Sequence, residues 1–388
     1  HLGTDGSAHR SFRAAAIILV LTVLLLVSFL PSDVRLFSRL QRGGAAGPVT
    51  SVMFLKTHKT GGSTVLNVLF RFAERHNLSV ALPAGDRLHL GYPWLFLAFY
   101  DTQLWSSEKI KIVSRRTRSP LLSPQVQKVL PEEGAFYFSI LRNPVSQLES
   151  AFAYYEGAVA AFLAAPWAFC NGSRRPGDAY ARNSMWFGFG FDNNAPATER
   201  YVRRLAEVER RFQLVLIAEH FDESMVMRRH ALRWRLDDVA YFRLNARSAA
   251  SVARLTPEAR ARARRWCALD WRLCQHFNRT FWARAHAELG PGRLRREVAQ
   301  LRARRGQLRA LCLQDGAPKS KTQIRDRQLQ PFQSGQADIL GYDLRPGLDN
   351  ETLRLCRRMA TPELQYMARL YARQFPEKPP KRIHFLEG

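Results

Sequence analysis

Two short polar stretches of this sequence carry the residues best suited to chemistry. The first reads THKTGGST at positions 57–64 and directly follows an apolar run, which predicts a turn between a strand and a helix. Such a turn offers free backbone N–H groups and the positive end of the helix dipole to an anion. The glycines allow close backbone approach, the hydroxyl residues could donate hydrogen bonds, and Lys59 adds a positive charge. The predicted phosphate contacts are Lys59, Thr60, Gly61, Gly62, Ser63 and Thr64.

This first turn is not a Walker A loop, because its lysine precedes the glycines and the G-x-x-x-x-G-K-[ST] spacing is absent. Taken alone, the turn is also compatible with an ordinary strand–helix connection that carries solvent-exposed lysines. A second stretch decides in favour of anion binding.

That second stretch reads LRNPVSQLES at positions 141–150. Arg142 follows another apolar run, and Asn143-Pro144 should end the strand and begin a helix. Ser150 then lies about two helical turns further on. Arginine binds phosphate through two hydrogen bonds, and the serine hydroxyl could donate from the same helix. Two anion-binding elements after two strands predict a ligand with two separate phosphate groups.

The elements that must position these turns follow a repeated pattern. An apolar strand, a polar turn and a helix occur in that order from residue 49, from residue 134 and from residue 212, where the apolar run FQLVLIAEH predicts a strand over 212–220. Continuous apolar strands alternating with helices predict a parallel sheet covered on both faces. Ligands of such sheets bind beyond the carboxyl ends of the strands, where both polar turns fall. The remainder is predicted to be mostly helical, so the expected fold is α/β with a helical C-terminal part.

The composition indicates an anionic partner without identifying it. The 388-residue chain has 59 Lys and Arg against 33 Asp and Glu, a formal net charge of +26. Nucleic acid, phospholipid, a nucleotide or an acidic glycan would each suit that charge. The features of the N-terminus and the glycosylation motifs described next argue against nucleic acid.

The N-terminal region predicts a membrane anchor. Residues 14–30 carry no charge and would form a helix of about 25 Å, the short end of a membrane span. A cleaved signal peptide is the alternative, but no A-x-A site follows the run. We therefore expect a tail at 1–13, a transmembrane signal anchor at 14–30, a stem at 31–48 and a lumenal body at 49–388.

The glycosylation motifs and cysteines fit a lumenal body. Four N-x-[ST] motifs lie C-terminal to the apolar run, at Asn77, Asn171, Asn278 and Asn350. The five cysteines show no C-x-x-C spacing, so no metal site is expected. One or two disulfides with at least one thiol left over are predicted, and the sequence does not give the pairing.

Together these motifs resemble one enzyme family. The combination of K-T-x-x-S-T after one strand and R-[DN]-P followed by a serine after another is similar to PAPS-dependent Golgi sulfotransferases. Longer stretches resemble the galactose 3-O-sulfotransferases over nearly the whole chain: FLKTHKTGGSTVLNVLFRF, ERRFQLVLIAEHFDES, LDDVAYFRLNARS and ILGYDL. The resemblance implies a type II Golgi membrane protein with a P-loop-like sulfotransferase fold. It also implies sulfation of the 3-hydroxyl of terminal β-galactose on N-acetyllactosamine-type and core 1-type glycans.

The resemblance also implies roles for individual residues. Lys59 matches the lysine of the 5′-phosphosulfate loop, residues 60–64 are that loop, and Arg142 with Ser150 matches the pair that binds the 3′-phosphate of PAPS. His58 matches the histidine beside the lysine and is the leading candidate for the base, since an unperturbed imidazole titrates near pH 6.5. His89, His220 and Glu219 are weaker site candidates. Trp186 and Tyr92 could stack on galactose, although apolar packing is commoner for both. No metal is implied, and the sequence does not decide whether the chain forms a homodimer.

The chain departs from the family pattern in places that bear on activity. Gly61 and Gly62 stand where relatives carry Ala-Ser, and Gly188 stands where an acidic residue is expected. In the segment 109–124, KIKIVSRRTRSPLLSP, the family's C-N-H-x-R-F is missing although PQVQKV follows normally. The alternative function is therefore a catalytically impaired glycan-binding membrane protein derived from such an enzyme. A nucleotide kinase is a more distant alternative, since neither a Walker lysine nor a magnesium-binding acid is evident.

Overall fold

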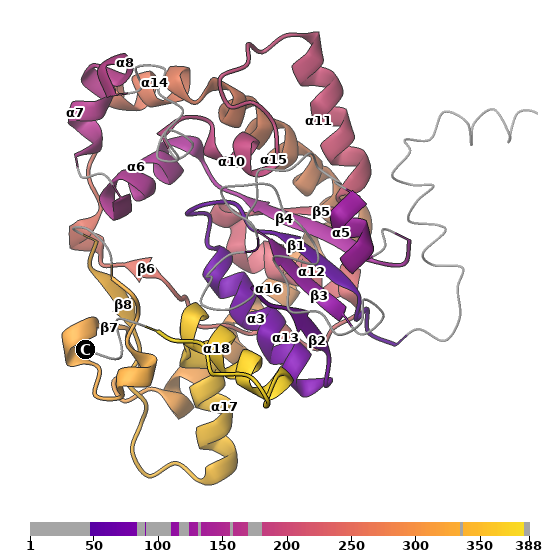
Figure 1. Ribbon diagram of the computed structural model, residues 1–388, viewed down its shortest axis with the longest axis vertical. Coiled ribbons are helices and arrows are strands. Elements are labelled where there is room, and N and C mark those ends of the chain that lie inside the picture. Colours follow the sequence, from indigo (N-terminus) through magenta and orange to yellow (C-terminus); the bar gives the residue numbers. More distant parts are fainter. Residues whose placement is uncertain are drawn as a thin grey trace, which may run out of the picture. The chain divides into compact units, whose positions relative to one another are not determined.

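Five parallel strands form the central sheet of the protein (Figure 1). They are β1 (Val52–Leu55), β2 (Ser79–Ala81), β3 (Ile110–Arg115), β4 (Phe136–Leu141) and β5 (Leu214–Ile217), in the spatial order β2-β3-β1-β4-β5. Every neighbouring pair is parallel. The predicted α/β class with a parallel sheet is therefore confirmed. Strand β1 lies at the centre, between β3 and β4, which places the first polar turn in the middle of the sheet edge.

The computed structural model describes residues 47–83, 90, 110–115, 124–130, 133–155, 158–169, 181–333 and 337–383. The predicted tail, anchor and most of the stem fall outside them. Within this part of the chain, no helix combines the length and the apolar character needed to cross a membrane.

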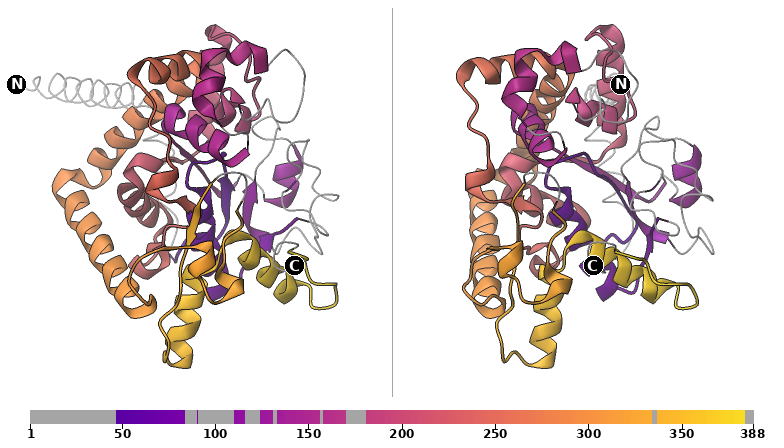
Figure 2. Two further views of the ribbon diagram at one scale, coloured as in Figure 1. Left: turned by 90° about the vertical axis from the view of Figure 1, so that its left-hand side faces the viewer. Right: turned by 60° about the vertical axis from the view of Figure 1, so that its left-hand side comes forward.

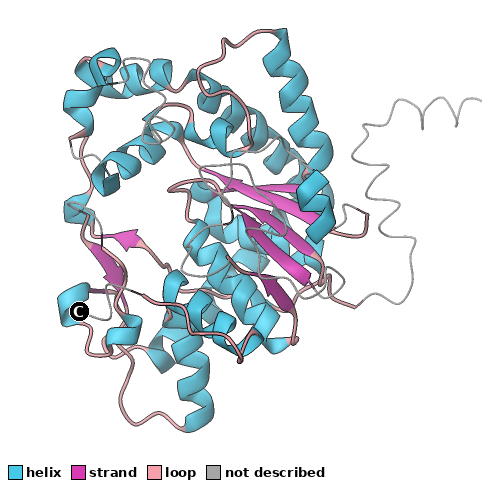
Figure 3. Cartoon of the chain, viewed as in Figure 1, coloured by secondary structure: helices cyan, strands magenta, loops and turns pink. Residues whose placement is uncertain are grey.

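Helices surround the sheet (Figure 3). They are α3 (Gly62–Arg75), α5 (Pro124–Val129), α6 (Pro144–Tyr155), α7 (Val159–Ala164), α8 (Pro166–Phe169), α10 (Ser184–Gly188), α11 (Glu199–Arg211), α12 (Phe221–Leu232), α13 (Leu236–Val239), α14 (Pro257–Trp266), α15 (Ala268–Glu288), α16 (Gly290–Cys312), α17 (Asn350–Ala360) and α18 (Glu363–Gln374). A small antiparallel sheet of β6 (Ala246–Arg247), β8 (Ile339–Gly341) and β7 (Lys319–Ser320) completes the fold.

The three predicted strand–turn–helix units are present as β1–α3, β4–α6 and β5–α12. The third strand is shorter than its apolar run, which had suggested a strand over 212–220. It ends at Ile217, and Ala218–His220 forms a 3₁₀ turn. Ser224 explains this end, because its hydroxyl accepts from the Ile217 N–H (2.9 Å) and donates to the Ile217 carbonyl (3.0 Å). A side chain from the following helix thus replaces a sheet partner there.

Helix α3 is buried on nearly all sides, not only on the apolar face that its periodicity predicts. All of its residues from Gly62 to Ala73 are buried, because α17 and α18 cover the side away from the sheet. Figure 2 shows the yellow C-terminal helix α18 beside the indigo α3. The last elements of the chain therefore pack onto the helix that follows the first polar turn.

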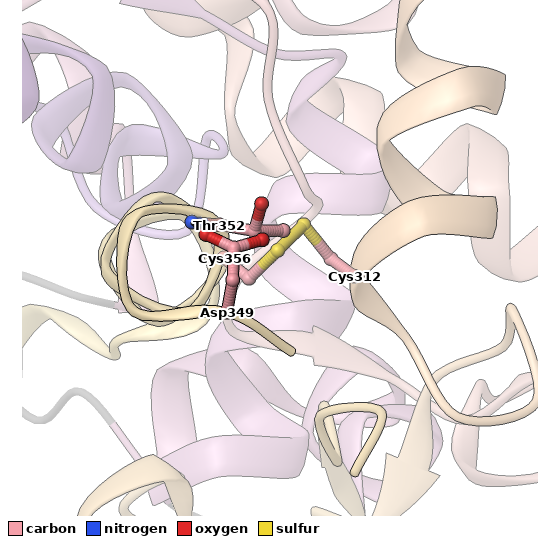
Figure 4. Close-up of a disulfide and its surroundings, with 4 residues drawn as sticks. All are labelled: Cys312, Asp349, Thr352 and Cys356. Carbon is pink, nitrogen blue, oxygen red and sulfur yellow. Dashed lines mark hydrogen bonds between the residues drawn. A yellow bond between two sulfur atoms is a disulfide. The ribbon is translucent and has the colours of Figure 1, made fainter. Parts of the chain in front are cut away.

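One disulfide joins the long helix α16 to this C-terminal cover. Cys312, at the end of α16, is bonded to Cys356 in α17 (Figure 4). Cys267 and Cys274 are free thiols, and Cys170 lies outside the described residues. The prediction of a disulfide with a thiol left over is confirmed, and the structure supplies the pairing. Asp349 caps α17 by accepting from the N–H groups of Glu351 and Thr352.

Candidate active site

A cleft of about 310 Å³ lies beyond the carboxyl ends of β1, β4 and β5. Its lining includes the first turn from Lys59 to Thr64, and also Arg142 and Ser150 from the second stretch. The two stretches that the sequence singled out thus meet at one site, although about 80 residues separate them. Ala218 and Phe221, which follow β5, line the same cleft.

The backbone of the first turn is shaped to present N–H groups. Lys59 and Gly61 both have left-handed conformations, with φ values of 56° and 87°. Helix α3 begins at Gly62 with glycine at its N-cap, and glycine has no side chain with which to cap the helix. The Thr64 N–H donates to the Gly61 carbonyl (3.1 Å), whereas the N–H groups before it have no acceptor within the helix itself. The turn can offer those earlier N–H groups to an anion.

The hydroxyls of the first turn are already engaged with the protein, which differs from the expectation that they donate to phosphate. Thr60 Oγ1 donates to the Thr57 carbonyl (3.1 Å) and Ser63 Oγ donates to Glu363 (2.7 Å). Thr64 Oγ1 donates to the Leu244 carbonyl (3.4 Å) and accepts from the Leu244 N–H (3.0 Å). A hydroxyl has one proton to donate. In this arrangement the turn therefore presents backbone N–H groups and cations rather than its hydroxyls.

Lys59 and Arg142 connect the two turns. The guanidinium of Arg142 donates from Nη1 to the Lys59 carbonyl (3.0 Å). The Lys59 ammonium lies over the ring of Tyr154, 3.7 Å from its centroid, and Tyr154 belongs to the same helix as Ser150. Cation–π contact holds the ammonium at the side of the cleft where α6 lies.

Arg142 is held by its surroundings more than by its own turn. Its backbone N–H donates to Met185 Sδ (3.4 Å), and its backbone carbonyl accepts from Cys274 Sγ (3.0 Å). Burial lowers the pKa of the guanidinium, and the nearby carboxylates of Glu219 and Glu149 oppose that change. Arginine nevertheless stays protonated in proteins, so the cleft carries a partly buried positive charge at this point.

A third basic segment lines the cleft, and sequence reasoning missed it. Arg243 and Arg247 lie in the stretch LDDVAYFRLNARS, which was noted only as part of the family resemblance. Arg247 forms a buried ion pair with Glu149 of α6 and donates to the Ser251 carbonyl (3.0 Å). Lys56, directly after β1, is also part of the lining. Arg243 and Arg247 lie beyond any strand–turn–helix unit, so no local signal placed them here.

His58, the candidate base, is buried beside the cleft. Only 3% of the residue is exposed, it is not part of the cleft lining, and its carbonyl accepts from Gln147 Nε2 (3.2 Å). The structure thus places His58 next to Lys59 in the turn but with its side chain among packed residues.

The weaker candidates occupy different environments. Glu219 is exposed and accepts from the Asn143 N–H (2.9 Å), which ties the second turn to the end of β5. The ring of His220 packs edge-on against Trp282. Trp186 is only 2% exposed and packs against Phe191 and Tyr201, so it is a core residue and does not offer a face to a sugar. His89 and Tyr92 lie outside the described residues.

The segment that departs from the family pattern contributes a strand. Residues 110–115 form β3, which pairs with β1 so that Arg115 is opposite Leu55. Residues 116–123, where the C-N-H-x-R-F motif would end, lie outside the described residues. Gly188 lies against the first turn: a Cβ there would be 3.3 Å from Thr57 Cγ2. Within the part of the chain that the structure covers, no group of His, Cys, Asp and Glu could hold a metal ion.

Three of the four glycosylation motifs can be placed. Asn77, after α3, and Asn350, at the start of α17, are exposed. Asn278 lies within helix α15 and is partly buried, a less accessible position than the other two. Asn171 lies outside the described residues.

A parallel α/β sheet with a cation-lined cleft at its carboxyl edge, built from these two motifs, is the architecture expected of a sulfotransferase. The family model described as galactose-3-O-sulfotransferase matches residues 9–374, so the chain belongs to this sulfotransferase family. It is 64% identical to galactose-3-O-sulfotransferase 2 of Sus scrofa, with 99% of each chain covered. It is 63% identical to galactose-3-O-sulfotransferase 2 of Homo sapiens, with 98% of each covered. It is also 38% identical to galactosylceramide sulfotransferase of Mus musculus, over 85% of this chain and 80% of that protein.

Proposed function

We propose that this protein transfers the sulfuryl group of PAPS to the 3-hydroxyl of a terminal β-galactose on glycoprotein or glycolipid glycans. One observation carries the proposal: a single cleft brings together Lys59 to Thr64 after β1 with Arg142 and Ser150 after β4. The relatives named galactose-3-O-sulfotransferase 2 support galactose as the acceptor. We expect N-acetyllactosamine-type and core 1-type acceptors.

The two turns would bind opposite ends of the donor. The backbone N–H groups of residues 60–63 and the Lys59 ammonium would bind the 5′-phosphosulfate, where negative charge grows on the bridging oxygen as the sulfur–oxygen bond breaks. Arg142 and Ser150 would bind the 3′-phosphate, with Arg247 close by. This division suits a donor with two separated anionic groups, and ATP lacks the second of them.

His58 would accept the proton of the galactose 3-hydroxyl as that oxygen attacks sulfur. Because its side chain is buried, this role requires the imidazole to turn toward the acceptor. His58→Ala should retain affinity for 3′-phosphoadenosine 5′-phosphate (PAP) and lose transfer. Unchanged turnover in that variant would dismiss His58 as the base.

The test of the function is transfer of radiolabelled sulfate from PAPS to a terminal β-galactoside. A matched acceptor whose galactose carries hydrogen in place of the 3-hydroxyl should receive no label. Equal labelling of both acceptors would refute 3-O-sulfation. No labelling of either acceptor, together with retained binding of the galactoside, would favour the alternative of a catalytically impaired glycan-binding protein, which the atypical segment 109–124 motivates.

We further propose that the chain is a single-pass type II protein of the Golgi membrane with its catalytic body in the lumen. The uncharged run at 14–30, the four glycosylation motifs and the disulfide support this location. Enzymatic removal of N-glycans from protein made in mammalian cells should increase its electrophoretic mobility. Mobility unaffected by that treatment would argue against a lumenal body.

A further inference from the structure

Lys56 and Glu363 form an ion pair at the base of the first turn. The Lys56 residue is 4% exposed and contributes to the cleft lining, and its ammonium is bonded to the Glu363 carboxylate. The same oxygen, Oε2, accepts from the hydroxyl of Ser63 at 2.7 Å. One carboxylate oxygen therefore joins Lys56, directly before the turn, to Ser63 within it.

Tertiary packing makes this contact. Glu363 is the first residue of α18 and lies 307 residues from Lys56 in sequence. Helix α18 packs against α3, which brings its N-terminal end to the first turn. The stem of Lys56 runs across Gly62, because a Cβ at Gly62 would lie 2.7 Å from Lys56 Cγ. A side chain at position 62 would thus displace the lysine.

The charges around this pair explain why the turn needs a carboxylate. The ammonium of Lys56 lies beside Ser63, near the N-terminus of α3, where the helix dipole is positive. Lys59 and Arg142 add further positive charge to the same cleft. A buried ammonium is costly unless a counter-charge accompanies it, and Glu363 provides one.

We propose that Glu363 is a positioning residue for the donor turn, acting through Lys56, and that its carboxylate competes with the 5′ end of the bound nucleotide for the Lys56 ammonium. This inference rests on the proposed function. The competition limits how tightly an anionic nucleotide is held and so favours release of PAP after transfer. The C-terminal helix thereby sets the affinity of a turn that lies at the opposite end of the sequence.

Glu363→Gln tests the inference because glutamine keeps the shape and removes the charge. Without the Glu363 charge, the bound nucleotide becomes the counter-ion of Lys56, so PAP should bind about fivefold more tightly. The KM for PAPS should fall, and kcat should fall with it because PAP is released more slowly. Isothermal titration calorimetry with PAP measures the affinity directly. Affinity that is unchanged or weaker in this variant would overturn the proposal.

Two more variants test whether the effect passes through Lys56. Lys56→Met should weaken PAP binding about tenfold, and this result does not depend on the folding of the Glu363 variant. In the double variant, loss of the Glu363 charge should add little to the effect of Lys56→Met. Unchanged PAP affinity in Lys56→Met, or an equal gain from Glu363→Gln in both backgrounds, would refute the role of Lys56.

Glu297→Gln is the matched control. Glu297 lies in α16, pairs with Arg229 and Arg293, and is not part of the cleft lining. Glu297→Gln should leave the affinity for PAP unchanged. If it tightened PAP binding as much as Glu363→Gln does, the effect of Glu363→Gln would come from the change in net charge and not from its contact with Lys56. A wild-type protein that does not bind PAP would refute the proposed function itself. Wild-type binding without a gain in Glu363→Gln would refute only this inference.

Discussion

The two turns that line the cleft both offer hydrogen-bond donors and positive charge to an anion, but they do so with different groups. The first turn relies on its backbone: Lys59 and Gly61 are left-handed, and α3 begins with an uncapped glycine. The second turn relies on one side chain, since Asn143 Oδ1 accepts from the Val145 N–H and so caps the start of α6 itself. What that turn itself leaves for an anion is the guanidinium of Arg142, which donates to the Lys59 carbonyl, while Met185 and Cys274 contact the backbone of Arg142.

This difference teaches where each turn is vulnerable. A backbone site depends on local conformation, so changes within residues 59–64 should act directly. A side-chain site depends on its supports, and for Arg142 these are Met185, Cys274 and the Lys59 carbonyl. The following predictions separate the two cases, from the largest expected effect to the smallest.

Removal of the first-turn lysine should have the largest effect. Lys59→Ala should lower kcat for sulfate transfer about 10³-fold, because the ammonium would stabilise charge developing on the leaving group. PAP and adenosine 5′-phosphosulfate, which lacks the 3′-phosphate, should both bind more weakly. Calorimetry with both ligands measures these affinities. If Lys59→Ala bound either ligand as tightly as the wild-type protein does, the assignment of Lys59 to the 5′-phosphosulfate would be wrong.

Removal of the second-turn arginine should discriminate between the same two ligands. Arg142→Ala should weaken PAP binding about 100-fold and leave adenosine 5′-phosphosulfate much less affected. Arg142→Lys should recover little, because lysine cannot form the two parallel hydrogen bonds of a guanidinium. Equal losses of affinity for the two ligands would show that Arg142 does not bind the 3′-phosphate.

Adding one methyl group should test the backbone character of the first turn. Gly62→Ala places Cβ 2.7 Å from Lys56 Cγ, so we expect about 1–3 kcal/mol of destabilisation from overpacking. Gly306→Ala in α16 is the control, since a Cβ there meets nothing within 4 Å and should stabilise the helix by about 1 kcal/mol. Thermal denaturation of both variants provides the comparison, and a stable Gly62→Ala would mean that the turn tolerates side chains.

The support of the second turn should respond to pH. Asp270 is fully buried and accepts from the N–H groups of Met185 and Trp186, at 3.0 and 2.7 Å. Burial raises its pKa to about 7, well above the unfolded value near 3.9. The folded protein then binds the extra proton between about pH 4 and 7, so this group's contribution to stability falls as pH rises through that window.

The expected loss from Asp270 is about 1 kcal/mol between pH 6 and 7. Asp270→Asn, which cannot ionise, should flatten this part of the curve of melting temperature against pH. An unaltered pH dependence in that variant would show that Asp270 does not titrate between pH 6 and 7.

Local sequence was sufficient for three of the five strands of the central sheet and for the two turns, whereas β2 and β3 were not predicted. Hydrophobic runs placed β1, β4 and β5, because continuous apolar strands followed by polar turns are typical of parallel sheets. The positions of Lys59 and Arg142 followed from those strand ends. The membrane anchor, the glycosylation motifs and the roles of the site residues in catalysis stay predictions.

Local sequence failed where a partner from a distant element decides the outcome. It extended β5 through residue 220, since it could not show that Ser224 would take the place of a sheet partner. It expected hydroxyl donors in the first turn, but Thr57, Leu244 and Glu363 engage those hydroxyls. It also gave no reason to place Arg243 or Arg247 in the cleft lining, or Glu363 against Lys56 and Ser63.

The sequence by itself determined which residues follow the strands, because the period of apolar residues and the turn chemistry are local properties of the chain. Only the tertiary structure decided which charges meet: the Cys312–Cys356 pairing, the burial of His58, and the contact of Glu363 with Lys56 and Ser63. Such contacts depend on how helices pack across hundreds of residues. No local spacing along the chain encodes them, since the partners lie far apart in the sequence.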